Sequence, residues 1–168
     1  MSNSRSRKGY EFGRLSYEVI GACIDVQRQL GLHCMEPDYQ RALALALPKR
    51  GLQFQREAEI PVVYDGHVVT KRRVDFLIWN DTGERLLLET KASSKIRPED
   101  IEQCLLYLHQ GSYPLCLLIN FGVKPLGVQR LVHTVSTEKA TMKGNTKGNT
   151  KDAKETTKDT KETTKGAK

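Results

Sequence analysis

The stretch from Arg72 to Ala92 constrains the fold of this chain more than any other part of the sequence. Two apolar runs of strand length, 74–79 and 86–88, flank the segment 80–84. That segment reads Asn-Asp-Thr-Gly-Glu, and residues of these types favour a turn. The sequence therefore predicts a β-hairpin.

The register of this hairpin decides which charged residues meet. If Trp79 pairs with Arg85, the residue numbers of each facing pair sum to 164, and Asp75 lies opposite Glu89. Lys91 is two residues further on and shares their face. Carboxylates that face each other across strands repel, and strands this apolar would solvate them poorly. We therefore expect a positive charge between them.

A divalent cation such as Mg²⁺ suits two hard oxygen ligands, so Asp75 and Glu89 are candidate metal ligands. Lys91 beside them could orient a water molecule or stabilise negative charge on a phosphate. The alternative is an exposed hairpin whose charges point at water. One Asp and one Glu-x-Lys form a short pattern. Taken alone, this pattern favours the exposed hairpin.

Length and charge suggest how the chain is organised. With 168 residues and 38% apolar side chains, we predict a basic extension at 1–14, one domain at 15–135 and a tail at 136–168. The formal charge of +7 comes from the two ends, because residues 15–136 hold 14 basic and 14 acidic side chains. Net charge therefore does not predict a basic groove in the domain. The Lys/Thr-rich tail repeats short polar motifs, so we expect it to be disordered.

The cysteines and the N-terminus indicate the compartment. The cysteines show no Cys-x-x-Cys spacing and no ligand spacing with the histidines, which favours free thiols over a zinc site. The basic N-terminus lacks a following apolar stretch, and no run approaches membrane-spanning length. We expect a cytoplasmic protein with free thiols at Cys23, Cys34, Cys104 and Cys116.

Three segments have the apolar spacing of helices. The first follows a Ser16 cap and runs to about Leu30, the second has Pro37 in its first turn, and the third spans 98–111. The residues expected on their buried faces are Val19, Ile20, Cys23, Ile24 and Leu30, then Tyr39, Ala42, Leu43, Ala46 and Leu47, then Ile101, Cys104, Leu105 and Leu108.

Polar residues on two of these helices have more than one interpretation. Glu36 lies at the start of the second helix, where capping is favoured over catalysis on physical grounds alone. Gln103 and Tyr107 share a face away from most of the apolar stripe, so they either line a site or meet solvent.

Other segments predict strands. Residues 53–60 alternate between the two faces, and after Pro61 the segment 62–69 carries Asp-Gly between β-branched residues, a hairpin signal. The apolar run 115–120 is typical of a central strand covered on both faces. Residues 129–135 are predicted to form the last strand.

The order of these motifs resembles a known family. Between Leu15 and Val132 it resembles the GxxExxY proteins of the PD-(D/E)XK nuclease superfamily. The resemblance implies an α/β (α+β) fold with a mixed central β-sheet flanked by helices and a restriction-endonuclease-like core. The motifs that carry it are L-S-Y-E-V-I-G-A, Glu36 with Tyr39, F-Q-R-E-A-E-I-P-V-V-Y-D-G, R-V-D-F-L-I, L-L-L-E-T-K-A, Gln103 with Tyr107, and L-L-I-N-F-G.

The resemblance also implies roles for individual residues. On the family pattern, Asp75 and Glu89 would be metal ligands, and Lys91 would be the catalytic lysine. Glu36 would be a helix-borne carboxylate near the metal, and Gln103 would add a polar group from the next helix. The chain departs from the pattern twice, because histidine replaces the glycine of GxxExxY at position 33 and valine replaces the proline of PD-(D/E)XK at position 74.

The leading hypothesis is a nuclease that uses Mg²⁺ or Mn²⁺ to hydrolyse phosphodiester bonds in DNA, in preference to RNA. Asp75, Glu89 and Glu36 would hold the metal, with Lys91 and Gln103 completing the site. One alternative is a catalytically inactive nuclease-fold module that binds nucleic acid or a protein partner. Another is a structural protein with an incidental acidic cluster. The oligomeric state stays open, with a homodimer among the options.

Overall fold

The computed structural model describes residues 13–132, so the predicted tail and nearly all of the predicted N-terminal extension lie outside it. Within this range the chain forms a five-stranded sheet in the order β1-β2-β3-β4-β5. Strands β3 and β4 are parallel and the other neighbours are antiparallel, which confirms the predicted mixed sheet. The elements are α1 (Gly13–Leu30), α2 (Glu36–Ala46), the 3₁₀ helix η1 (Pro48–Arg50), β1 (Gln53–Tyr64), β2 (His67–Trp79), β3 (Arg85–Lys91), α3 (Pro98–Gly111), β4 (Leu115–Asn120) and β5 (Gly127–Val132).

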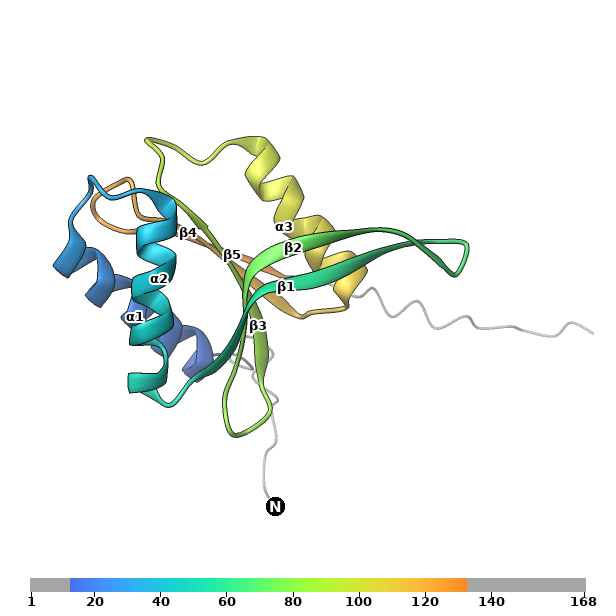
Figure 1. Cartoon of the computed structure of the whole chain (residues 1–168), viewed down its shortest axis with the longest axis horizontal. Coiled ribbons are helices and arrows are strands. Elements are labelled where there is room, and N and C mark those ends of the chain that lie inside the picture. The colour runs from blue at the N-terminus through green and yellow to red at the C-terminus, as the bar shows by residue number, and fades with distance from the viewer. Residues whose placement is uncertain (1–12, 133–168) are drawn as a thin grey trace, which may run out of the picture. The chain divides into compact units, whose positions relative to one another are not determined.

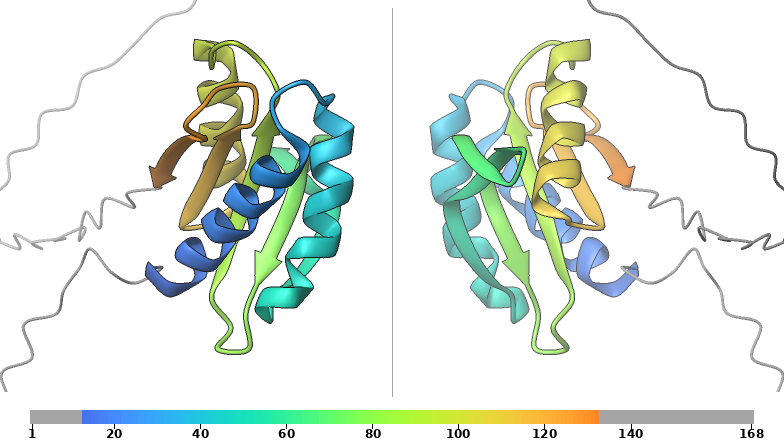
Figure 2. Two further views of the ribbon diagram at one scale, coloured as in Figure 1. Left: turned by 90° about the vertical axis from the view of Figure 1, so that its left-hand side faces the viewer. Right: turned by 90° about the vertical axis from the view of Figure 1, so that its right-hand side faces the viewer.

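Helices cover both faces of the sheet (Figure 1). Figure 2 shows α1 and α2 in front of the sheet from one side and α3 in front of it from the other. Two apolar cores result, one beneath α1 and α2 and one beneath α3. Strand β4 is buried along its whole length, as predicted for a central strand. Helix α3 supplies the crossover that the parallel strands β3 and β4 need.

The helices match the predicted segments, with differences at one end and on the buried faces. Helix α1 begins at Gly13, so Ser16 lies inside it, and the Ser16 hydroxyl donates to the Gly13 carbonyl at 3.4 Å. The prediction of Ser16 as the cap is therefore wrong. The predictions that Ile24, Leu30 and Leu105 are buried are also wrong, because each helix packs on one layer only and these side chains are 41%, 38% and 45% exposed.

The first hairpin is longer than predicted. Strand β1 continues through Pro61 to the Asp65-Gly66 turn, and β2 then runs without interruption from His67 to Trp79. The sequence predicts separate strands on either side of Pro61, and proline lacks the N–H that a ladder needs. Proline is tolerated here because β1 is the edge strand and Pro61 pairs only with Lys71 on β2.

The predicted register of the second hairpin is confirmed over four pairs. Trp79 pairs with Arg85, and the ladder continues to Phe76 opposite Leu88. It ends there, one pair short of the predicted Asp75–Glu89 pair. Asp75 is likewise unpaired in the β1–β2 ladder, which passes from Arg56–Phe76 to Ala58–Val74. Asp75 therefore lies at a break in both ladders of its strand.

The backbone twists at this break. The residue of β1 nearest to it, Glu57, has a φ of 49°, in the left-handed region that side chains seldom adopt. Phe76 and Ile78 contact the core beneath α1 and α2, whereas Val74, of the same parity, contacts the core beneath α3. The hairpin thus changes the layer that it covers at the position of Asp75.

Two further predictions can be compared with the structure. All four cysteines are free, as predicted. Among the helices between residues 13 and 132, none combines the length and the apolar character needed to cross a membrane.

Candidate active site

The end of strand β3 carries the Glu-x-Lys motif. Glu89 and Lys91 lie on one face, and Nζ of Lys91 is 2.9 Å from Oε1 of Glu89. The Glu89 side chain is almost completely buried, and its second oxygen, Oε2, has no hydrogen-bond partner. Lys91 thus supplies a positive charge beside Glu89, but one carboxylate oxygen is left unsatisfied in the interior.

Burial and neighbouring charges change the protonation of this pair. Burial, together with the charge of Asp75, raises the pKa of Glu89 to about 7, and Lys91 opposes the rise. Burial alone would lower the pKa of Lys91, but the charges of Glu89, Glu36 and Asp75 outweigh it and raise that pKa. At neutral pH the lysine is therefore a permanent cation beside a carboxyl group that titrates.

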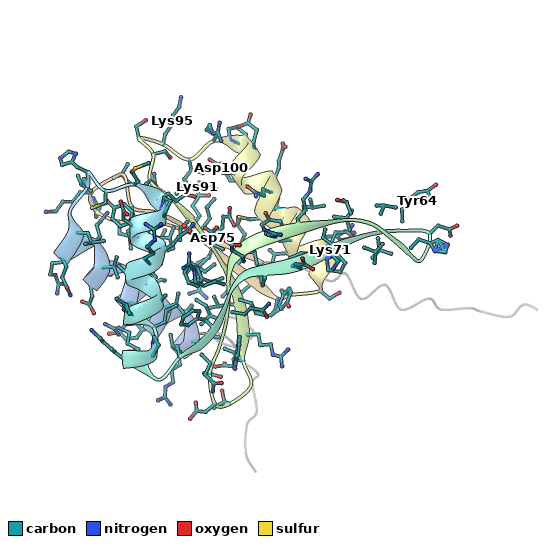
Figure 3. All side chains as sticks on the ribbon, viewed as in Figure 1. Tyr64, Lys71, Asp75, Lys91, Lys95 and Asp100 are labelled. Carbon is teal, nitrogen blue, oxygen red and sulfur yellow. The ribbon has the colours of Figure 1, made fainter. Side chains whose placement is uncertain are left out.

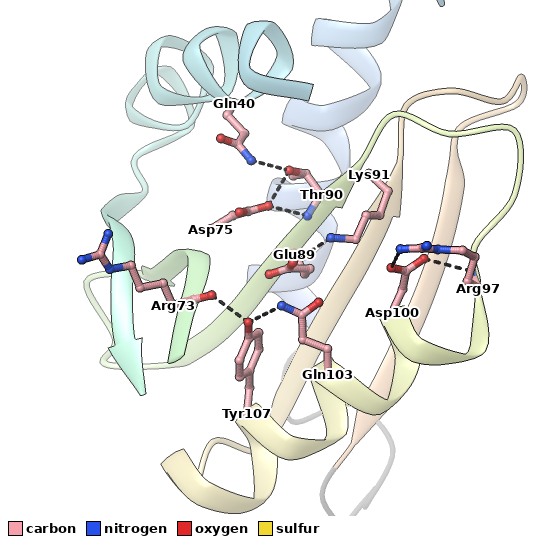
Figure 4. A network of polar contacts seen from close by, with 10 residues as sticks. All are labelled: Gln40, Arg73, Asp75, Glu89, Thr90, Lys91, Arg97, Asp100, Gln103 and Tyr107. Atoms are coloured by element: carbon pink, nitrogen blue, oxygen red, sulfur yellow. Dashed lines mark hydrogen bonds and ion pairs between the residues drawn. The ribbon is translucent and has the colours of Figure 1, made fainter. Parts of the chain in front are cut away.

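Asp75 is held by strand β3 through Thr90. Its Oδ2 accepts a hydrogen bond from the Thr90 backbone N–H at 2.8 Å and another from the Thr90 hydroxyl at 2.5 Å (Figure 4). Gln40 of α2 donates to the same hydroxyl oxygen at 3.1 Å. Sequence analysis missed both Thr90 and Gln40, because a threonine in a strand and a glutamine on a helix carry no distinctive signal.

Glu36, the first residue of α2, is directed to the site and does not cap its own helix. The carboxylate of Asp38 accepts from the Met35 backbone N–H at 3.0 Å and takes the capping role. Burial raises the pKa of Glu36, Lys91 lowers it and Asp75 raises it, while a hydrogen bond from the backbone of Ala92 also lowers it. The capping role favoured on physical grounds is thus wrong, and α2 brings Glu36 close to Lys91.

Helix α3 reaches the site through a buried tyrosine. Gln103 donates from Nε2 to the Tyr107 hydroxyl, which donates to the Arg73 carbonyl at 2.7 Å. Burial raises the pKa of Tyr107 to about 12, although the Gln103 hydrogen bond lowers it, and the charges of Glu89 and Asp75 contribute to the rise. Tyr107 thus joins α3 to β2 two residues before Asp75. Gln103 contacts Tyr107, and its position beside the carboxylates stays a prediction.

A clamp at the ends of β3 and β4 fixes the backbone after Lys91. Buried Asn120 donates from Nδ2 to the Ser93 carbonyl at 2.8 Å and accepts at Oδ1 from the N–H groups of Ser93 and Gly122, at 3.1 and 3.0 Å. The Phe121 N–H donates to the Lys91 carbonyl at 2.7 Å. The sequence signal for this clamp is an asparagine at the end of an otherwise apolar strand.

The carboxylates at this site are of the chemical type that a hard divalent cation prefers. Oε2 of Glu89 is buried and unsatisfied, and carboxylates from Glu89, Asp75 and Glu36 are the ligands that Mg²⁺ prefers. In the part of the chain that the structure describes, however, no three His, Cys, Asp or Glu side chains are grouped closely enough to hold an ion. Asp75 is bonded to Thr90, and Glu89 is bonded to Lys91. The metal ligands stay a prediction.

Figure 3 places Asp75 and Lys91 where the long hairpin leaves the body of the molecule. The mixed sheet flanked by helices is the fold that the resemblance implies, and it carries Asp75 on β2, the Glu-x-Lys motif on β3 and Glu36 on α2. Searches of curated proteins and of solved structures find no match. The sequence model of the PD-(D/E)XK nuclease superfamily matches residues 13–131. The chain therefore belongs to the PD-(D/E)XK nuclease superfamily.

Proposed function

We propose that this protein is a nuclease that hydrolyses phosphodiester bonds in DNA with Mg²⁺ or Mn²⁺ as cofactor, and that it belongs to the GxxExxY group within the superfamily. The observation that carries the proposal is the buried Glu89 carboxylate, with one unsatisfied oxygen, beside Asp75 and Lys91. Leaving a buried carboxylate oxygen unpaired is costly, and a protein that used this group only for folding would gain by replacing it.

In this proposal Asp75, Glu89 and Glu36 hold the cation. A divalent ion bound there lowers the pKa of water and polarises the phosphate oxygen. Lys91 keeps its charge at neutral pH, so it can orient the attacking water and stabilise negative charge that develops on the phosphate oxygens. Gln103 of α3, which is hydrogen-bonded to Tyr107, helps to orient the reacting groups.

The residues around the site support this assignment of roles. Thr90 occupies one oxygen of Asp75 with two hydrogen bonds, which fixes the orientation of the carboxylate. The clamp around Asn120 fixes the backbone immediately after Lys91. Catalytic groups need supports of this kind, because a misplacement of about 1 Å can cost about 100-fold in rate.

The experiment that tests the proposal is cleavage of labelled duplex DNA and of RNA by the full chain in Mg²⁺, in Mn²⁺ and in EDTA. Glu89→Gln and Lys91→Met should abolish metal-dependent cleavage of DNA, whereas Asp81→Asn, an exposed change in the turn at the other end of β3, should leave it intact. Circular dichroism would show that each variant is folded.

Two outcomes would contradict the proposal. One is a wild-type protein that cuts no substrate with either ion, and the other is a Lys91→Met variant that cuts as well as wild type. If calorimetry shows that the wild type binds Mg²⁺ but no cleavage occurs, the inactive nucleic-acid-binding module becomes the better description.

A further inference from the structure

The β1–β2 hairpin extends beyond the sheet as a two-stranded arm. Strand β3 pairs with β2 only from Phe76 to Trp79, so residues 67–74 of β2 have β1 as their sole strand neighbour. We call residues 61–73 the arm, and Figure 1 shows its tip projecting beyond α3. At about 3.3 Å per residue, the eight steps along β2 from Asp75 to His67 span about 26 Å.

The arm contacts α3 both at its base and close to its tip. The Val63 N–H donates to Oε1 of Gln110 at 3.0 Å, and the Arg73 carbonyl accepts from the Tyr107 hydroxyl. Ile60, just before the arm, is buried in the core beneath α3. These contacts fix the direction of the arm relative to Asp75, which follows it in the same strand.

The tip of the arm exposes large apolar side chains. Tyr64 is 75% exposed, and Val63, Val68 and Val69 are also exposed. A two-stranded ribbon is barely stable on its own, and its exposed apolar residues do nothing to stabilise it. Apolar residues gathered on a protruding surface mark an interaction site.

The base of the arm is basic and lies beside the candidate site. Lys71, Arg72 and Arg73 are consecutive and exposed. Lys71 and Arg73 pair with glutamates of β1 in ion pairs exposed to water, which contribute little and can be exchanged for phosphates. Arg72 forms no ion pair with residues 13–132, and it lines a groove of about 360 Å³ together with Gln103, Tyr107 and two glutamates of α3, Glu99 and Glu102.

We propose that the arm enters the major groove of duplex DNA. The apolar tip would contact base edges while Arg72, with its two basic neighbours, contacts the backbone near the cleaved bond. A two-stranded ribbon fits the major groove, which is about 12 Å wide, and about 26 Å of arm corresponds to about eight base pairs. The arm would thereby select duplex over single strands and position it at Asp75. This inference rests on the proposed function, because it takes DNA as the substrate.

The test measures binding of the full chain to a fluorescent 20-base-pair duplex by anisotropy, in EDTA so that nothing is cut, at several KCl concentrations. Arg72→Ala should reduce the slope of log affinity against log salt by about 0.9, the value for one lost phosphate contact. Arg28→Ala on α1 removes the same charge from another exposed arginine and should not change the slope. Tyr64→Ser should weaken binding at least about fivefold, as expected for a lost base contact, whereas Tyr17→Ser, at a 72% exposed tyrosine on α1, should not.

Several results would overturn the proposal. Equal binding by the arm variants and their controls, or no binding by any protein, would do so. So would a dimer, seen by sedimentation, that Tyr64→Ser dissociates without changing DNA affinity, because the arm would then join two copies. Cleavage by wild type with unaltered binding by the arm variants removes the arm proposal and leaves the proposed function. If the arm variants weaken binding but the wild type cleaves nothing, the arm proposal stands and the proposed function fails.

Discussion

Glu89 should make the metal-free protein less stable as the pH rises. Its pKa is raised from the ordinary 4.5 to about 7 in the folded state, first by burial and then by the charge of Asp75. The folded state therefore favours the protonated carboxyl group. Its stabilising contribution is complete below pH 4.5, declines as the pH passes through about 7 and is lost above about pH 8. At about 1.4 kcal/mol per pH unit, the loss amounts to about 3 kcal/mol.

The variant Glu89→Gln isolates this effect, because glutamine keeps the shape and does not titrate. Urea unfolding in EDTA should show that the free energy of unfolding of the variant, relative to wild type, rises by about 3 kcal/mol between pH 4 and pH 8.5. Glu102→Gln, at an exposed position on α3, should show no such change with pH. A difference between Glu89→Gln and wild type that stays constant across this range would refute the reasoning, since the pKa of Glu89 would then be the same in the folded and the unfolded protein.

Two further changes test the supports of the site. Thr90→Val keeps the side-chain shape but removes the hydroxyl between Gln40 and Asp75, so urea unfolding should show that the free energy of unfolding falls by about 1.5 to 3 kcal/mol. Thr90→Ser keeps the hydroxyl and should lose much less. Equal losses in the two variants would mean that the hydroxyl contributes nothing. Gly122→Ala would place a Cβ 2.4 Å from the Ser93 carbonyl oxygen, so the backbone must shift, and we expect a loss of about 1 to 3 kcal/mol together with reduced cleavage. Unchanged stability and cleavage in that variant would show that the clamp does not position Lys91.

The hairpin registers show what local sequence determines. The turn types at 80–84 and at Asp65-Gly66 were sufficient to predict the loops, and the pairing of Trp79 with Arg85 followed from loop length. The continuity of β1 through Pro61 could not be predicted, because it depends on β1 being an edge strand. Whether a strand lies at an edge is decided by distant parts of the chain.

Long-range contacts also decide which faces are buried. Periodicity favoured Leu105 as a core residue and left Tyr107 undecided, yet Leu105 is exposed and Tyr107 is buried. A tyrosine can be buried when its hydroxyl finds partners, and here Arg73, on another strand, supplies the acceptor. That partner is 34 residues away in the sequence, so no local pattern on α3 indicates it.

The charged residues of the candidate site could be predicted from the sequence, but the residues that hold them in place could not. The hairpin register and the resemblance together predicted Asp75, Glu89, Lys91 and Glu36 as site residues, and in the structure the charges of Asp75 and Lys91 act on both Glu36 and Glu89. The orientation of the Asp75 carboxylate depends on Thr90. The Thr90 side chain points to the face opposite Glu89 and Lys91, and its hydroxyl oxygen accepts a hydrogen bond from Gln40 on α2.

The hydrogen bond from the Thr90 amide to Asp75 gives the protein an internal spectroscopic reporter. Beyond the last pair of the β2–β3 ladder, this N–H is bonded to a side-chain carboxylate in place of a strand carbonyl. Its amide proton resonance should therefore respond to anything that alters the charge or position of Asp75. One cross-peak in a ¹H–¹⁵N spectrum would follow ion binding at Asp75 directly, without any substrate or turnover.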